Sequence, residues 1–527
     1  MLFTSYEFIA FLCGLFILYY LIPKKFQWIL LLVGSAVFYA WAGIRFLAYI
    51  GVTTVTTWYA GTRISGIQEA GNAYYDAHKK EMDKEARKAY KADVKKKTRG
   101  WFLACLLLNL GILAVVKYTD FVIDNINAIF HGEISFLSFA LPMGISFYTF
   151  KSMGYLIDVY RGKTKAQSNL AKFALFVSFF PQIIQGPISR YDKLSETLYG
   201  EHAFDPVRIR SGLMRIAWGF FKKLVIADRL LAGVKTLSAK PEEYQGAYVV
   251  LIILFYAIEL YADFTGGIDI TIGVGEIFGI KMEENFITPY FSKNINEYWT
   301  RWHITMGAWF KDYIFYPLSV SQPMLKLSKW SRDHMGKAVG KRVTVYIANI
   351  VVWFATGLWH GAAWNFIVWG MLNCVVTVAS YEMEPLYKKF HTALPCTNRG
   401  WYDVFQMFRT FWLMGAIRIL DVYRNVPTSF KQVGTIFTTG GWGSIFSADV
   451  LKLGLTGADY LVVLIGCILM IAVSIVRYRQ KDDIRVNFEK RGVVCVSAVI
   501  LLLVFAVLIF GAYGVGYDAT QFIYNQF

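Results

Sequence analysis

The 527-residue chain is 56% hydrophobic and 17% aromatic, and only 17% of its residues are charged. This composition excludes a soluble multidomain protein and predicts an all-α, polytopic membrane protein. The 54 Lys and Arg against 37 Asp and Glu fit the basic cytoplasmic loops of such proteins, and because no basic cluster lies on an independent soluble domain with interleaved aromatics, we expect no nucleic-acid partner.

The six cysteines are scattered, mostly within apolar runs, and none forms a C-x-x-C pair. They indicate neither a disulfide framework nor a thiolate metal site, so we expect no metal. The first apolar segment starts near Phe8, follows Glu7 instead of a basic region, and has no small-residue cleavage site after Leu21. We interpret it as a retained membrane helix and not as a signal peptide.

Four apolar runs near the N-terminus are long enough to span a bilayer. They cover residues 8–22, 27–43, 46–62 and 101–117. Lys24 and Lys25 separate the first two, and a strongly basic segment separates the third from the fourth. Positive charge is typical of cytoplasmic loops, which places both loops inside and the N-terminus outside.

The segment 72–99 within the second loop carries charges of both signs and few large apolar residues. Its basic residues are Lys79, Lys80, Lys84, Arg87, Lys88, Lys91, Lys95, Lys96, Lys97 and Arg99, and its acidic residues include Glu81, Asp83, Glu85 and Asp93. This pattern predicts a solvated cytoplasmic helix. The alternative is a segment that holds a partner or acidic head groups.

Two apolar segments, 141–150 and 179–188, are interrupted by proline and glycine. Helices broken at membrane depth persist only where protein or a water-filled cavity covers the freed backbone groups. We therefore expect re-entrant segments that line an internal cavity.

The next apolar stretch is punctuated by basic residues at short, irregular spacings. They are Arg208, Arg210, Arg215, Lys222, Lys223 and Arg229. This pattern predicts a helix that lies in the cytoplasmic interface with its basic side in the head groups. The alternative is that Lys222 and Lys223 attract the phosphates of a cytosolic acyl donor.

A further span near 248–261 carries Glu259, and Asp263 follows four residues later, so both carboxylates share one helical face. We interpret them as a structural pair with Arg301 or a backbone amine; the alternative is a polar wall of a reaction chamber. The glycines over 266–279 let helices approach closely, and they resemble no phosphate-binding loop.

Five more spans are expected near 343–359, 362–379, 404–419, 460–476 and 493–510. Basic residues between the last two place that loop in the cytoplasm and the C-terminus outside. Since no soluble domain or internal repeat is present, we predict one integral-membrane domain over residues 1–527. Its parts are N-terminal helices over 1–117 with a cytoplasmic basic loop at 65–100, a catalytic core at 136–385, and C-terminal helices at 400–527.

The stretch 290–365 contains two of the seven histidines, each next to tryptophan and separated from each other by a basic loop. On a helix, Trp299, Trp302 and His303 would lie on one face. Glu297 and Arg301 could pair there at i, i+4. A buried imidazole is costly without a purpose, so both histidines are site candidates.

The second histidine, His360, lies in a Gly-x-x-x-Gly spacing formed by Gly357 and Gly361, which lets a helix or substrate approach the backbone. Acyl transfer from a thioester to a hydroxyl needs a base with a pKa near neutrality, a dry site and donors for the oxyanion. No serine elbow, zinc motif or paired-carboxylate motif competes. Residue types alone leave a catalytic, a substrate-binding or transport, and a structural histidine open.

The motifs resemble the membrane-bound O-acyltransferase (MBOAT) family, in order along most of the chain. The matching runs are 141–150 with 155–161, 179–182 with 186–188, 219–223, 263–266, 284–286 with 289–290, and 522–527. The most specific are Tyr-Trp-Thr-Arg-Trp-His-Ile-Thr at 298–305, Trp-Phe-Lys-Asp-Tyr at 309–313 with 317–318, and Gly-Leu-Trp-His-Gly at 357–361. Within the family, the chain is most similar to the alginate O-acetyltransferase branch, which acetylates extracellular polysaccharides.

The resemblance implies a ring of membrane helices around a thinned centre, with a funnel from each face that meets near the histidines. It implies that His360 is the catalytic base and that His303 is the second catalytic-site residue, which binds or orients. The substrate-binding candidates are Trp302, Trp359, Asn365, Arg301 and Asp312. No tightly bound cofactor is implied; acetyl-CoA, or an acyl-carrier thioester, would be the co-substrate.

The same resemblance implies a multi-pass protein of the cell membrane that takes its acyl group from the cytosol. The acceptor would be an extracellular polysaccharide, reached directly or through an extracellular acetyltransferase or esterase-like partner protein. Residues 319–321 stand where the branch usually has a glycine pair, and Gly267 stands where an aromatic is usual. These departures leave the donor-side loop and the pocket size open.

Other functions remain as alternatives. The D-alanyl transfer branch of the same family decorates teichoic acids from a carrier-protein thioester. A transporter or flippase would also contain broken helices and buried charge, although the inverted repeats typical of that class are not found. A structural scaffold would leave His303 and His360 unexplained.

Overall fold

The computed structural model describes residues 1–480 and 483–513, and in this part the regular secondary structure is helical apart from one isolated β-bridge between Phe286 and Trp302. Seven helices of the described part are long and apolar enough to cross a membrane. They are Lys24–Ala42, Lys84–Phe130, Ala247–Ile277, Arg342–His360, Trp364–Glu382, Gly457–Gln480 and Val493–Phe510. The prediction of an all-α, polytopic membrane protein is confirmed. The matching run at 522–527 lies outside the described residues.

The chain forms two compact units, residues 1–209 with 274–282 and residues 210–273 with 283–527. The first contains α1 (Tyr6–Leu21), α2 (Gln27–Ala42), α3 (Leu47–His78), α4 (Lys84–Phe130), α5 (Ile145–Tyr160), α6 (Leu170–Ser178), α7 (Phe180–Ile183) and α8 (Tyr191–Leu198). Most residues of the remaining helices belong to the second unit. These helices are α9 (Pro206–Phe220), α10 (Asp228–Ala239), α11 (Ala247–Ile277), α12 (Ile295–Arg301), α13 (Ile304–Phe310), α14 (Tyr316–Ser319), α15 (Gln322–His360), α16 (Trp364–Glu382), α17 (Glu384–Ala393), α18 (Gly400–Tyr423), α19 (Val426–Thr438), α20 (Gly457–Gln480), α21 (Ile484–Lys490) and α22 (Val493–Phe510).

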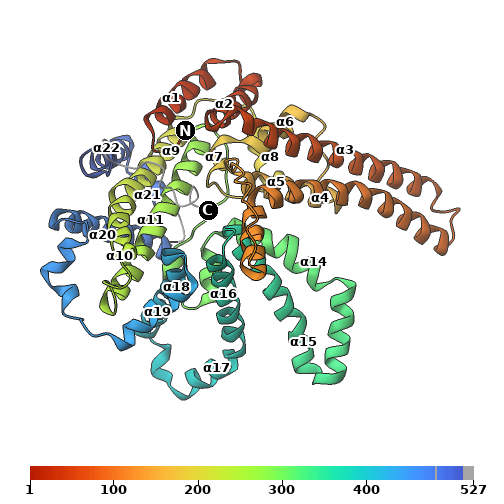
Figure 1. Ribbon diagram of the computed structural model, residues 1–527. Coiled ribbons are helices and arrows are strands. Elements are labelled where there is room, and N and C mark those ends of the chain that lie inside the picture. Colours follow the sequence, from red (N-terminus) through yellow and green to blue (C-terminus); the bar gives the residue numbers. More distant parts are fainter. Residues whose placement is uncertain (481–482, 514–527) are drawn as a thin grey trace. The chain divides into compact units, whose positions relative to one another are not determined.

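In the first unit, α3 and α4 form a long helical hairpin (Figure 1). The segment 72–99 is helical as predicted, but it is not one separate helix. It consists of the end of α3 and the start of α4, and α4 continues into one of the seven helices that are long and apolar enough to cross a membrane. The chain turns between them because the Asp83 carboxylate caps α4, accepting from the Ala86 amide at 2.6 Å.

The two predicted breaks meet in the first unit. Gly144 precedes α5 with φ 69°, and α7 is only four residues long. A side chain at Gly144 would collide with the Ile183 carbonyl, so glycine serves both the turn and the approach. The buried Lys151 ammonium donates at 2.7 Å to the Phe176 carbonyl. Lys151 therefore satisfies a backbone carbonyl just before the second break. The re-entrant course of these two segments stays a prediction.

Three basic residues of the stretch 208–229 do not reach the head groups as predicted, because their side chains are buried in the protein. Arg215, Lys222 and Lys223 lie on α9 and on the π-helical turn Phe221–Ala227. The ion pairs, at 2.5–2.9 Å, are Arg215 with Asp269 and Glu284, Lys222 with Asp269, and Lys223 with Asp228 and Asp263. The interfacial prediction is wrong for these residues because carboxylates on nearby segments neutralise them inside the protein.

Small residues bring α9 and α11 into backbone contact. A Cβ atom at Gly219 would lie 2.6 Å from the Gly266 carbonyl oxygen, and one at Gly273 would lie 2.7 Å from the Ile216 side chain. The predicted close approach of helices at this glycine series is therefore confirmed. The contact brings the basic side chains of α9 within reach of the acids on α11.

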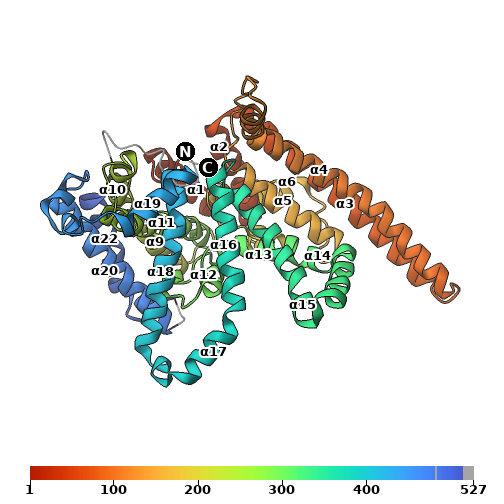
Figure 2. The ribbon, with the colours of Figure 1, turned by 60° about the horizontal axis from the view of Figure 1, so that its bottom comes forward.

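α15 consists of two helical arms that fold back on each other (Figure 2). The chain reverses at Gly336, whose φ of 82° is readily adopted only by glycine. A Cβ atom at Gly340 would clash with the Arg332 backbone, so the two arms touch. The stretch predicted as a basic loop between the histidines is thus a helical hairpin.

α15 and α16 cross at two glycines. A Cβ atom at Gly357 would clash with the Phe366 carbonyl, and one at Gly370 would clash with the Trp353 carbonyl. The predicted role of Gly357 in close backbone approach is confirmed. This crossing holds the end of α15, and with it His360, against α16.

We expect Gly370→Leu to destabilise the protein by about 1–3 kcal/mol, because the new side chain would force α15 and α16 apart. Thermal unfolding of the purified protein in detergent measures the effect. Gly434→Leu on α19 is the matched control, since nothing lies within 4 Å of a Cβ atom there. Equal melting temperatures for the two variants would contradict the crossing.

Candidate active site

His303 lies on a sharp turn and not within a helix. α12 ends before Trp302, α13 begins after His303, and His303 has φ 47°. Two backbone hydrogen bonds of 3.0 Å pair this turn with the segment 285–287, from Ile287 to Arg301 and from Ile304 to Asn285. The prediction that Trp299, Trp302 and His303 share one helical face is wrong, because this pairing replaces the next helical turn.

Asn285 determines which ring nitrogen of His303 carries the proton. Its side-chain oxygen accepts from the Thr305 backbone N–H at 3.1 Å and from the Thr305 hydroxyl at 2.9 Å, and it lies 3.2 Å from Nδ1 of His303. Because a backbone N–H can only donate, the atom that faces Thr305 is the oxygen, and Nδ1 must donate to it. In the neutral ring this leaves the lone pair on Nε2.

The His303 side chain is held in its neutral form. It is 1% exposed, and in the sequence it falls between the spans Ala247–Ile277 and Arg342–His360. Burial, together with the positive charge of Arg418, lowers the pKa of its imidazole to about 3. At neutral pH His303 therefore presents an uncharged hydrogen-bond acceptor.

His360 ends α15, and its ring packs against two indoles. The ring centroids lie 4.8 Å from Trp369 and 5.1 Å from Trp359. Trp359 also lies 6.0 Å from the His303 ring, so one indole contacts both imidazoles. His360 is 9% exposed. The structure thus brings together two histidines that are 57 positions apart in the sequence.

A buried arginine joins the surroundings of both histidines. The Arg418 guanidinium of α18 lies 5.3 Å from the Trp302 ring and 4.8 Å from the Trp369 ring, and it pairs with Asp421 at 2.9 Å. Trp302 precedes His303, and Trp369 contacts His360. Arg418 was not predicted from the sequence. The feature that could have indicated it is the spacing of Arg418 and Asp421, a charged pair at i, i+3 at the end of the predicted span 404–419.

Comparison with known proteins identifies the family. The model of the membrane-bound O-acyltransferase (MBOAT) family matches residues 165–420, which include both histidines and Arg418. A probable alginate O-acetylase, AlgI, of Azotobacter vinelandii is 32% identical over 450 residues, which are 84% of this chain and 79% of that protein. The chain belongs to the MBOAT family.

Two further relatives show the range of acyl groups and acceptors. The peptidoglycan O-acetyltransferase of Helicobacter pylori is 29% identical over 427 residues, 76% of this chain and 72% of that protein. The teichoic acid D-alanyltransferase of Bacillus subtilis is 29% identical over 286 residues, 53% of this chain and 67% of that protein. This MBOAT protein is an acyltransferase, and the prediction of an enzyme is confirmed. The roles of its individual site residues remain predictions.

The substrate-binding candidates fall into two groups in this MBOAT structure. Trp302 and Trp359 are buried in the aromatic cluster around the imidazoles. The Asn365 amide instead donates to the Leu420 carbonyl at 3.2 Å and ties α16 to α18. Asp312 is half-buried on the π-helical turn Lys311–Phe315.

Arg301 also makes protein contacts. It pairs with Glu297 at 2.6 Å, as the i, i+4 spacing predicts, and donates to the Thr288 hydroxyl at 3.0 Å. The interpretation that Arg301 pairs with Asp263 is therefore wrong. Asp263 binds Lys223, which approaches from the turn after α9 and lies nearer in the fold.

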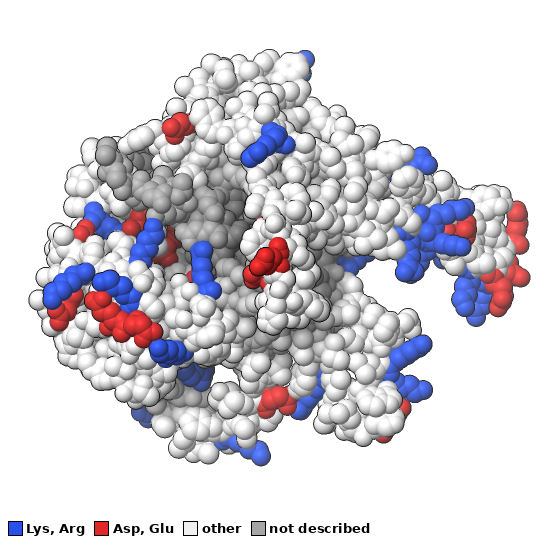
Figure 3. Space-filling view, viewed as in Figure 1, with Lys and Arg blue, Asp and Glu red and all other residues white. Residues whose placement is uncertain are grey.

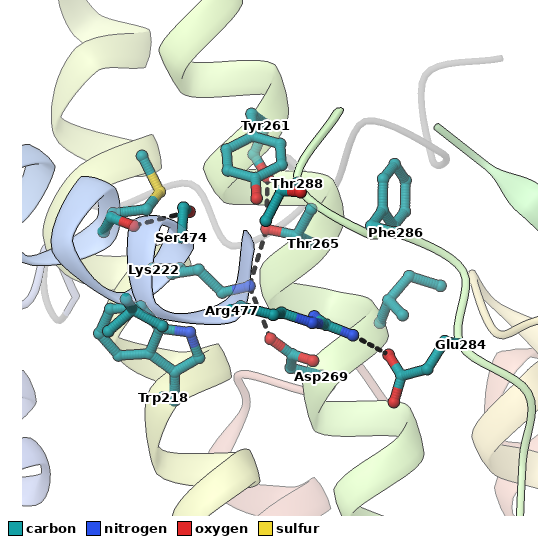
Figure 4. A pocket seen from close by; sticks show the side chains of 13 residues that line it. Trp218, Lys222, Tyr261, Thr265, Asp269, Glu284, Phe286, Thr288, Ser474 and Arg477 are labelled. Carbon is teal, nitrogen blue, oxygen red and sulfur yellow. Dashed lines mark hydrogen bonds and ion pairs between the residues drawn. The ribbon is translucent and has the colours of Figure 1, made fainter. Parts of the chain in front are cut away.

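A small cavity is lined in part by Phe286, whose ring lies near that of His303 (Figure 4). It encloses about 40 Å³, room for roughly three waters but not for a nucleotide or a pantetheine chain. Lys222 reaches into it between the Thr265 hydroxyl and the Asp269 carboxylate, each at 2.7 Å. Because its ammonium already holds a carboxylate, the alternative that Lys222 attracts donor phosphates receives no support here.

Phe286 forms the wall between this cavity and the site, with its ring centroid 6.3 Å from that of His303. The neighbouring Glu284 carboxylate forms ion pairs with the guanidinium groups of Arg215, at 2.7 Å, and Arg477, at 3.1 Å. Burial raises the pKa of Glu284, but the two guanidinium charges outweigh burial and hold it below its usual value. This anchored carboxylate fixes the segment that carries Asn285.

We expect nitrogen-15 spectra of histidine-labelled protein to show His303 protonated on Nδ1 and not on Nε2. Asn285→Asp keeps an oxygen acceptor at Nδ1 and should retain this tautomer, whereas Asn285→Ala removes it and should populate the other. The spectrum of His303→Gln, which lacks this ring, identifies the signal that belongs to His303. A protonated Nε2 in the wild-type ring would contradict the role of Asn285.

The pKa of His303 also predicts a pH dependence of stability. The unfolded chain binds a proton at this ring near pH 6.5, whereas the folded protein does not until about pH 3, so stability falls as pH falls below 6.5. Between pH 7 and pH 5 the expected loss is about 2 kcal/mol. Thermal unfolding of wild type and His303→Gln at both pH values measures it. A variant with the same pH slope as wild type would refute the neutral ring.

Proposed function

We propose that this MBOAT acyltransferase moves an acetyl group from cytosolic acetyl-CoA to hydroxyl groups of an extracellular polysaccharide. The observation that supports this most strongly is the pair of imidazoles in contact with Trp359, one of them with its lone pair at Nε2. Two relatives that cover most of the chain are named for O-acetyl transfer, to alginate and to peptidoglycan. Transfer is direct or passes through an extracellular esterase-like partner protein.

In the proposed reaction, His360 is the general base. It takes the proton of the acceptor hydroxyl as that oxygen attacks the thioester carbonyl carbon. The carbon–sulfur bond then breaks, and the departing thiolate takes the proton from the imidazolium. His303, neutral and with a lone pair on Nε2, orients the hydroxyl by accepting a hydrogen bond.

The indoles and Arg418 supply the environment of the proposed step. Trp302, Trp359 and Trp369 exclude water from the imidazoles, which strengthens every electrostatic interaction there. The positive charge of Arg418, fixed between two indole rings, favours the negative charge that develops on the carbonyl oxygen.

The share of the chain covered by each relative favours acetyl over D-alanyl transfer. Similarity to the two acetyl-transferring relatives spans 76–84% of the chain, and similarity to the D-alanyltransferase spans 53%. The basic loops of this multi-pass membrane protein indicate that the α3–α4 hairpin faces the cytosol and that both termini lie outside. Donor and acceptor then approach from opposite sides of the cell membrane.

Mass spectrometry of envelope polysaccharide from a strain that lacks the gene tests the proposal, because it identifies the missing substituent and its carrier together. The strain is complemented with wild type, with His360→Ala, and with His334→Ala, which removes an exposed histidine from the same helix α15. We expect loss of acetyl groups in the deletion strain and at least a 100-fold lower transfer rate for His360→Ala, since general-base catalysis contributes about that much. His334→Ala should restore acetylation.

Membrane fractionation and gel filtration show whether His360→Ala is inserted and folded. Normal acetylation by that variant would refute the role of His360. Loss of D-alanine instead of acetyl groups from the deletion strain would refute the proposed donor and acceptor.

A further inference from the structure

The end of α20 carries basic residues that serve in the sequence as a sign of membrane topology. Arg477 and Arg479 lie in its last turn, and the loop that follows is predicted to be cytosolic. Figure 3 shows Lys and Arg side chains gathered along the α3–α4 hairpin, the other segment with this prediction. Arg479 is exposed, as a topology signal requires. Arg477 and its neighbour Tyr478 are half-buried and contact the segments that hold His303.

Arg477 holds the segment 284–287. Its Nη2 atom donates to the Glu284 carboxylate at 3.1 Å (Figure 4). Arg215 binds the same carboxylate from α9, so two helices fix this residue. The next residue is Asn285, whose side-chain oxygen accepts the Nδ1 proton of His303. A shift of Glu284 would therefore move the acceptor that selects the tautomer.

Tyr478 holds the opposite partner of the same pairing. Its ring centroid lies 5.3 Å from the Arg301 guanidinium and 5.4 Å from the Phe291 ring centroid. A guanidinium near an aromatic ring is attracted by the negative face of the ring. Arg301 lies two residues before His303, and its carbonyl accepts from the Ile287 amide at 3.0 Å. Tyr478 thus restrains the backbone that leads into the His303 turn.

The contact between Asn285 and His303 has little tolerance for movement. The distance of 3.2 Å between Oδ1 and Nδ1 is at the upper end of the range for N–H···O hydrogen bonds. A small separation of the two paired segments would break it. Because Arg477 and Tyr478 are consecutive residues of one helix, their contacts fix the two segments relative to each other.

We propose that Arg477 and Tyr478 are positioning residues, which hold both paired segments and so keep Asn285 opposite Nδ1 of His303. Without their contacts the His303 ring can carry its proton on Nε2, and the lone pair that orients the acceptor hydroxyl is then lost. The effect on the tautomer is a property of the protein itself. The effect on acyl transfer rests on the proposed function of His303.

Nitrogen-15 spectra of the full-length, histidine-labelled protein in detergent test the proposal, together with polysaccharide acetylation by the complemented deletion strain. Arg477→Gln and Tyr478→Leu each remove one contact, whereas Arg477→Lys keeps the charge and Tyr478→Phe keeps the ring. Arg479→Gln is the matched control, because it removes the same charge from an exposed position in the same helical turn. Both contact residues are half-buried at a helix end, so neither substitution opens a core cavity. Thermal unfolding verifies that the variants are folded.

We expect Arg477→Gln and Tyr478→Leu to show a second His303 signal, from a ring protonated on Nε2. Their transfer rates should be about tenfold below that of wild type, since a small misplacement of an orienting group is costly. Arg477→Lys, Tyr478→Phe and Arg479→Gln should keep the Nδ1 tautomer and restore acetylation. An unchanged tautomer in both contact variants, or the same change in Arg479→Gln, would overturn the proposal.

The two measurements separate this proposal from the proposed function. Normal acetylation by His303→Gln would refute the role of His303 in the reaction, while an altered tautomer in Arg477→Gln would still support the positioning contacts. Loss of acetylation by His303→Gln, combined with wild-type spectra of both contact variants, would overturn the positioning contacts alone.

Discussion

The buried Arg418 guanidinium is the constraint on which the arrangement of the site depends. It is 7% exposed in an apolar interior, where an isolated charge would be prohibitive. Asp421 supplies the counter-charge, and the rings of Trp302 and Trp369 supply faces that attract a cation. Trp302 precedes His303 in the sequence, and the Trp369 ring contacts His360. The contacts that stabilise the Arg418 charge therefore also determine how far apart the two imidazoles lie.

A second electrostatic anchor acts on the segment that pairs with the His303 turn. Arg215 and Arg477 hold the Glu284 carboxylate, and the next residue, Asn285, accepts the Nδ1 proton of the ring. The left-handed backbone at His303 costs about 1–3 kcal/mol and persists only where neighbouring contacts over-determine it. The backbone pairing with segment 285–287 provides those contacts. Ion pairs far from the imidazole therefore control which of its nitrogens can act.

Sequence patterns anticipated local features well and contacts between distant segments poorly. Glu297 with Arg301 and the close approach at Gly357 follow from helical spacing, and both are present. The turn at His303 broke the helical expectation because a segment from outside the helix pairs with it. The partner of Asp263 was assigned wrongly for the same reason, since several cations were available and only the fold determines which one is near.

The sequence by itself, through its composition and its family motifs, determined that this is an all-α membrane acyltransferase and where most of its helices run, and it supplied the prediction that His303 and His360 form the site. Apolar length, helical period and a family motif are all properties of neighbouring residues. Only the tertiary structure decided the tautomer of His303, the place of Arg418 between two indoles, and the burial of Lys222 and Lys223 in ion pairs. Each of these depends on contacts between side chains from separate segments of the chain. Distance and desolvation determine which of these contacts form, and neither can be derived from the spacing of residues along the sequence.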